Sequence, residues 1–156
     1  MDEGLVSELG NGVFSLATDY PGVANWPLWV SLVRGNSVAL VDSGVATTYD
    51  AELQCGFEQL GVVPNDVRLL LITHGHPDHL GEAWSIKRDT SAAIAAPLEG
   101  AGWVEDFDLA WREFWLDLAD GDPIEDDHHL LATLSGKPGV VDRLLRDRGL
   151  LGRARK

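Results

Sequence analysis

The segment that most constrains this chain is a hexapeptide that directly follows a short apolar run. Residues 74–79 read HGHPDH, and residues 69–73 before them read LLLIT. An apolar run of this kind predicts a buried β-strand, so three histidines and an aspartate should lie where that strand ends. The chain has five histidines in 156 residues. Three of them in one hexapeptide favour a metal site over a surface turn that is merely rich in histidine.

The residue types in this hexapeptide are those of a first-row metal site. Neutral imidazole and carboxylate suit Zn²⁺ or a similar ion. His74 and His76 are two positions apart, so both side chains can point to one side of an extended segment. Asp78 and His79 follow Pro77, whose fixed φ bends the chain, and adjacent side chains diverge. We therefore predict two neighbouring metal positions, one held by His74 and His76 and the other by Asp78 and His79.

These residues resemble a known family. Residues 73–81, THGHPDHLG, are similar to the His-x-His-x-Asp-His signature of the metallo-β-lactamase-fold hydrolases. Residues 38–44, VALVDSG, resemble the strand of that family that ends in Asp and Gly, ahead of a helix and the motif strand. The resemblance covers roughly residues 5–120. It implies an α+β fold, the αββα sandwich, with one or two metal ions and hydrolysis by a metal-activated water. It also implies that His74 and His76 bind the first metal and that Asp78 and His79 bind the second.

The second half of the family pattern is not evident in the sequence. The family also uses a third His for the first metal, an Asp that bridges both metals and a final His for the second. The residues after Asp120 contain only the adjacent pair His128 and His129. Either the pair begins a helix or one of them is an additional ligand. We predict a single domain over residues 1–156, family-like over 1–120 and divergent or truncated over 121–156, so that the sandwich is incomplete in its second half.

Other side chains are candidates for supporting roles. Asp42 ends a predicted strand, and we interpret it as a carboxylate that fixes a loop or orients a ligand rather than as a ligand itself. Trp26, Trp29 and Trp103 lie in or near predicted loops and could wall an apolar site. Cys55 has no second cysteine to pair with, and we expect it to be a small buried residue in a reducing compartment.

The charge and the hydropathy restrict the partners. The formal net charge is −13, which disfavours nucleic acid and anionic membranes as partners. There is no apolar run long enough to span a bilayer, and residues 1–4, MDEG, are acidic where a signal peptide would be basic. We therefore expect a cytoplasmic protein that acts on a small molecule.

The residue patterns also predict the elements. Residues 49–60 place Tyr49, Leu53, Phe57 and Leu60 on one helical face, with Thr48 as a possible N-cap and Gly61 just beyond the end. The predicted strands are 5–9, 13–18, 27–33, 38–42, 68–73 and 92–96, of which the first four form two hairpins. The predicted helices are 49–60, 80–87, 104–119 and 140–148.

Two functions are consistent with this sequence. The first is a metal-dependent hydrolase, with zinc as the expected ion, that acts on an ester, thioester or lactone; Asp78 would orient the water or bind a second ion. The second is a degenerate metal-binding remnant that serves as a binding module. In either case half of a two-sheet sandwich should leave one sheet face open, and we therefore predict a homo-oligomer.

Overall fold

A single mixed sheet forms the centre of the structure, which is a computed structural model that describes residues 5–19, 27–46, 48–100, 102–103 and 143–145. Within these residues the sheet has seven strands in the order β1-β2-β3-β4-β5-β6-β7. The strands are β1 (Val6–Gly10), β2 (Val13–Asp19), β3 (Pro27–Arg34), β4 (Val38–Val41), β5 (Val67–Leu71), β6 (Ala93–Pro97) and β7 (Arg143–Leu145). The six strands predicted from sequence are all confirmed, with ends shifted by a residue or two.

The first four strands form an antiparallel meander. The turn between β1 and β2 requires left-handed backbone at Gly10, Asn11 and Gly12, with φ of 101°, 53° and 78°. At Gly12 a Cβ would also lie 2.6 Å from the carbonyl oxygen of Arg34. Glycine therefore allows this turn to pack against the following hairpin.

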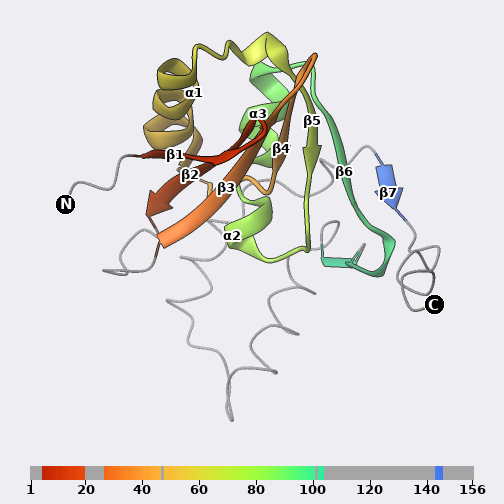
Figure 1. The fold of residues 1–156 in the computed structure, drawn as a ribbon. Coiled ribbons are helices and arrows are strands. Elements are labelled where there is room, and N and C mark those ends of the chain that lie inside the picture. Colours follow the sequence, from red (N-terminus) through yellow and green to blue (C-terminus); the bar gives the residue numbers. More distant parts are fainter. Residues whose placement is uncertain (1–4, 20–26, 47, 101, 104–142, 146–156) are drawn as a thin grey trace, which may run out of the picture.

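The last four strands are parallel, so a crossover must connect each pair. Between β4 and β5 the chain forms a π-helical turn η1 (Tyr49–Leu53), helix α1 (Gln54–Leu60) and a 3₁₀ turn η2 (Pro64–Asp66). Between β5 and β6 it forms α2 (Pro77–Leu80) and α3 (Ala83–Asp89), and η3 (Leu98–Gly100) follows β6. Figure 1 shows α1 and α3 beside the twisted sheet, with α2 at one end of it.

One hydrophobic core joins the helices to one face of the sheet. The predicted helical face is confirmed, because Tyr49, Leu53 and Phe57 are buried and Leu60 packs against the same cluster. Gly61 ends α1 with a φ of 63°, in the left-handed conformation that favours glycine. The sheet and α3 contribute Leu16, Val30, Leu32, Leu40, Leu70, Ile86 and Ile94 to this core.

The side chains on the opposite face of the sheet are apolar or small, and some of them are exposed. Trp29 and Val33 of β3 are 52% and 38% exposed. Directly paired residues share a face, and the pairing places two continuous rows on this side of β2 to β6. The rows are Val13, Val33, Ala39, Leu69 and Ala93, and then Ser15, Ser31, Val41, Leu71 and Ala95. Within the described residues, one sheet with helices on one face corresponds to half of the predicted αββα sandwich.

One predicted helix is wrong in its described part, and another is divided into two helices. The prediction for residues 140–148 is wrong at Arg143–Leu145, which form β7 and pair with the edge of β6. The unpaired backbone groups of that edge override the local helical pattern. The helix predicted over residues 80–87 is confirmed in part: α2 begins earlier, at Pro77, because proline is favoured in the first turn of a helix, and α3 covers residues 83–87. The predicted helix 104–119 lies outside the described residues.

Two smaller predictions are also corrected. Cys55 is exposed rather than buried, because it lies on the side of α1 that faces away from Phe57 and the sheet. Thr48 makes no side-chain capping hydrogen bond. Its hydroxyl oxygen is buried without a hydrogen-bond partner among the described residues.

Candidate metal centre

The hexapeptide 74–79 lies at the carboxyl ends of two parallel strands. Strands β4 and β5 pair side by side, with Val41 opposite Leu71, so their following loops leave the sheet at the same edge. The backbone N–H of Asp42 donates to the carbonyl of Leu71 at 2.8 Å. The sheet therefore brings the Asp42–Ser43–Gly44 loop against the histidine motif.

A single helical turn gathers the three histidines. His76 has extended backbone (φ −69°, ψ 150°), and Pro77 then starts α2. The carbonyl of His76 accepts the N–H groups of His79 and Leu80, each at 3.0 Å. This turn returns His79 beside His74, with ring centroids 4.0 Å apart, while the rings of His74 and His76 are 4.5 Å apart. His79 therefore lies nearer to the first pair than the divergence of adjacent side chains suggested.

Asp42 fixes the orientation of His79. Its Oδ2 lies 2.8 Å from His79 Nδ1, and its Oδ1 accepts the backbone N–H of Thr73 at 2.7 Å. The Thr73 hydroxyl lies 2.9 Å from each carboxylate oxygen and 3.0 Å from His74 Nδ1. Asp42 is 7% exposed and has a left-handed φ of 62°, which Asp tolerates better than most residues. A carboxylate on one ring nitrogen sets the tautomer and directs the other nitrogen toward the site.

Sequence reasoning missed three residues of this arrangement. Thr73, described above, links Asp42 to the first histidine. Ser43 donates its hydroxyl to the carbonyl of His79 at 2.9 Å and accepts the N–H of Glu82 at 3.2 Å. Gly44 has a φ of 73°, and a Cβ there would lie 2.8 Å from the Thr48 hydroxyl oxygen. The signal was available in part, since the three residues lie within two positions of Asp42 or His74 in the sequence, but their contacts depend on the pairing of β4 with β5.

The environment shifts the pKa values of the three imidazoles in different directions. Burial lowers the pKa of His74, and the neighbouring charge of His79 lowers it further. Burial likewise lowers the pKa of His76, with His74 as the next cause. Burial would also lower the pKa of His79, but the hydrogen bond to Asp42 and the charges of Asp78 and Asp42 together raise it. His74 and His76 are therefore kept in the neutral form that binds metals.

The donors fit a metal ion in chemical kind. Two ligand atoms about 2.1 Å from one tetrahedral ion are themselves about 3.4 Å apart, and His79 Nε2 lies 3.6 Å from Asp78 Oδ2. In the part of the chain that the structure describes, however, no three His, Cys, Asp or Glu side chains surround a common point that could hold an ion. The imidazole rings instead contact one another. His128 and His129 lie outside the described residues.

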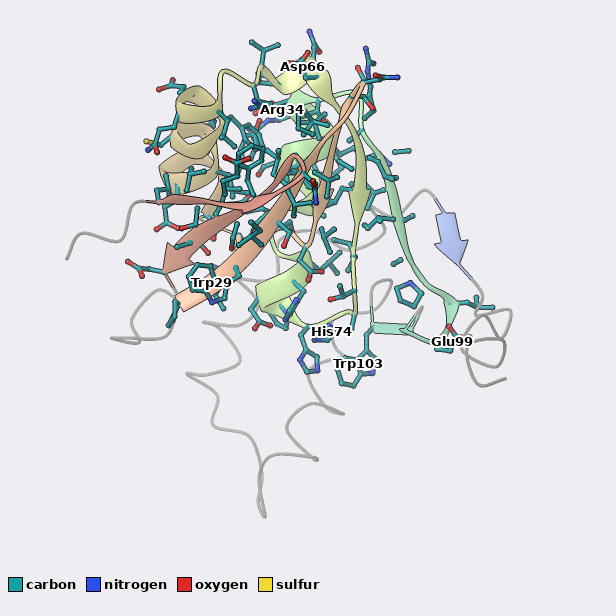
Figure 2. The ribbon with its side chains drawn as sticks, in the orientation of Figure 1. Trp29, Arg34, Asp66, His74, Glu99 and Trp103 are labelled. Atoms are coloured by element: carbon teal, nitrogen blue, oxygen red, sulfur yellow. The ribbon has the colours of Figure 1, made fainter. Side chains whose placement is uncertain are left out.

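One of the three tryptophans singled out from the sequence contacts this site. The rings of Trp103 and His76 are stacked, with centroids 5.0 Å apart and planes inclined by 17°. Figure 2 shows Trp103 next to His74 at the end of the sheet that carries α2. Trp29 lies on the open face of β3, and Trp26 is outside the described residues.

Comparison with known proteins identifies the family to which this fold and motif belong. Residues 25–153 match the metallo-beta-lactamase superfamily. The chain belongs to this superfamily, and the recognition from residues 73–81 is confirmed. A metal-dependent hydrolase from Bacillus pumilus is 31% identical over 75 residues, which are 45% of this chain and 33% of that protein.

Solved structures support the same fold. A metallo-beta-lactamase family protein from Thermus thermophilus aligns with a TM-score of 0.64 and 25% identity, over 90% of this chain and 48% of that one. A class B3 di-zinc metallo-beta-lactamase from an Alaskan soil metagenome aligns with a TM-score of 0.61 and 22% identity, over 92% of this chain and 46% of that one. The chain therefore spans about half the length of these structures. The prediction of a metallo-β-lactamase-like fold is confirmed.

Proposed function

We propose that this chain is a zinc-dependent hydrolase that cleaves a small ester, thioester or lactone. The observation that carries the proposal is the convergence of His74, His76 and His79 at a strand end, with Asp42 on Nδ1 of His79. Membership of a superfamily with metal-dependent hydrolases supports it. The net charge of −13 supports a small-molecule substrate rather than nucleic acid or an anionic membrane. No helix in the described ranges is long and apolar enough to cross a membrane.

The metal ligands in this proposal are His74, His76, Asp78 and His79. We assign His74 and His76 to one ion, and Asp78 and His79 to a second ion where two are bound. A bound zinc ion would supply a water of lowered pKa and would polarise the scissile carbonyl. The remaining ligands would come from His128 or His129, or from residues that this chain does not contain.

The chain's own residues prepare the site for that chemistry. Burial holds His74 and His76 neutral, so that each ring offers a lone pair without first losing a proton. Asp42 and Thr73 fix the two rings that flank the site. Asp78 has a side chain that is 26% exposed, so it is accessible to a substrate or a water. It would orient the attacking water or accept its proton.

Zinc content measured beside activity tests the proposal. The purified chain should bind zinc, and changing both His74 and His76 to Ala should abolish that binding because both neutral imidazoles are lost. Circular dichroism should show that the double variant keeps its fold. Unchanged zinc content in the double variant would show that the ligand assignment is wrong.

A second candidate function is a metal-binding module without turnover. The absence of an enclosing set of three ligands among the described residues favours it. The two functions differ in one measurement, because a module would bind zinc but would not hydrolyse a generic ester or a lactone. An active chain should hydrolyse at least one of these with a rate that falls when zinc is removed by a chelator.

We further propose that the chain self-associates in the cytoplasm. The open sheet face carries Trp29 and Val33 at 52% and 38% exposure, and an apolar patch of this kind is covered in most soluble proteins. The exposed thiol of Cys55 would remain reduced in that compartment. Light scattering should show a dimer or larger species, and Trp29→Glu should shift it toward the monomer. A wild-type monomer at micromolar concentration would contradict the association.

A further inference from the structure

The three histidines of the candidate centre are held by different contacts. His79 is held by the Asp42 carboxylate, and His74 lies 3.0 Å from the Thr73 hydroxyl. His76 precedes α2, and its carbonyl is fixed by two backbone hydrogen bonds. Those bonds hold the backbone of His76 at the start of α2, and the contacts of its ring are separate from them.

A tryptophan from a later segment packs on that ring. Trp103 comes after β6 and η3 in the sequence, and its indole is half-buried. The indole stacks on the His76 ring, with centroids 5.0 Å apart and planes inclined by 17°. His76 also touches His74 edge-on, with an inclination of 67°. The imidazole therefore lies between two rings, one parallel to it and one steeply inclined. Rotation of the imidazole about its side-chain torsions would break the stack with Trp103.

We propose that Trp103 is a positioning residue for the proposed ligand His76, because its stacked indole limits the rotation of that ring. The inference rests on the proposed zinc site. The face of an indole is electron-rich and attracts cations. An imidazole that carries positive charge from a bound ion should therefore stack more strongly than the neutral ring. The stack would restrict the His76 ring before zinc binds, so that less side-chain entropy is lost on binding. It would also favour the charged, metal-bound form of the ring.

Zinc affinity of matched variants tests this role. Trp103→Leu keeps an apolar side chain but removes the stack, and we expect it to weaken zinc binding by about ten-fold or more, as for the loss of other groups that orient a ligand. Trp103→Phe keeps an aromatic face and should retain most of the affinity. Val63→Ala is the control, because Val63 is 56% exposed and precedes η2, whose Asp66 lies at the end of the sheet opposite His74 in Figure 2. It should bind zinc as the wild type does.

A second measurement uses the metal-free protein. The ring current of Trp103 should shift the ring-proton resonances of His76 in NMR spectra, and the shift should disappear in Trp103→Leu. A wild-type spectrum without this shift would overturn the inference even if Trp103→Leu does not fold.

The two proposals fail in distinguishable ways. If the wild type binds zinc and Trp103→Leu binds it equally well, the positioning role is wrong and the zinc site stands. If the wild type binds no zinc, the proposed function is wrong and Trp103 has no ligand to position.

Discussion

Replacing Asp42 with Asn should weaken the candidate centre without removing any proposed ligand. Besides the Thr73 hydroxyl, Asp42 has a partner on each oxygen: the Thr73 N–H on Oδ1 at 2.7 Å and His79 Nδ1 on Oδ2 at 2.8 Å. An Asn side chain has one carbonyl oxygen and one NH₂ group. If the NH₂ group faces Thr73, it meets the backbone N–H, which is also a donor; if it faces His79, Nδ1 must become the acceptor, so that the proton moves to Nε2, the nitrogen needed for a metal.

The magnitude follows from the lost contact. A hydrogen bond to a charged group contributes about 1.5–3 kcal/mol, and the Asp42 side chain is only 10% exposed, so water cannot readily replace it. We expect Asp42→Asn to lower the free energy of unfolding by about 1.5–3 kcal/mol, since one such bond is lost. Zinc affinity should fall by about ten- to a hundred-fold, because the group that orients His79 is weakened.

The variant should also change how stability depends on pH in the metal-free protein. The pKa of His79 is raised against the effect of burial by Asp42 and Asp78. A raised histidine pKa contributes stability that is complete below the ordinary value of 6.5 and is lost as pH rises through the folded value. The stability advantage of the wild type over Asp42→Asn should therefore be larger near about pH 6 than near about pH 8.

Urea denaturation, zinc titration and NMR titration of the histidines measure these three effects. Asp89→Asn is the control, because it removes a carboxylate that pairs with the exposed Arg88 outside the site. It should leave zinc affinity and the pKa of His79 unchanged. Zinc affinity in Asp42→Asn that equals that of the wild type would refute the orienting role of Asp42.

Three further predictions concern other parts of the chain. Gly56→Ala should destabilise the fold by about 1–3 kcal/mol in urea denaturation, since overpacking costs this much and its Cβ would lie 2.5 Å from a methyl group of the fully buried Leu16. Burial raises the pKa of Glu82, so the ionised carboxylate lowers the free energy of unfolding above that pKa. The free energy of unfolding of the wild type, relative to Glu82→Gln, should therefore increase as pH falls from about 7 to about 4.5. If His128 or His129 is a ligand, changing that residue to Ala should weaken zinc binding and hydrolysis together. Wild-type zinc affinity and rate in both single variants would show that neither residue is a ligand.

Local sequence determined the parts of the fold that depend on neighbouring residues. Alternation and turn residues predicted both hairpins, and the spacing of Tyr49, Leu53 and Phe57 predicted the buried face of the first crossover helix. These features depend on side-chain periodicity and on backbone angles that glycine allows. The sequence likewise predicted the chemical type of the motif, because imidazole and carboxylate donors lie close together in residues 74–79.

Tertiary structure decided the contacts between segments that are distant in sequence. The pairing of β4 with β5 brings Asp42 to the His79 ring and Ser43 to the His79 carbonyl, 37 and 36 residues apart. The free edge of β6 made a strand of Arg143–Leu145, where the local pattern indicated a helix. The stack of Trp103 on His76 depends on where the chain returns after β6. Each of these contacts is made with a backbone group or a ring of another element, so the local periodicity of one segment carries no information about it.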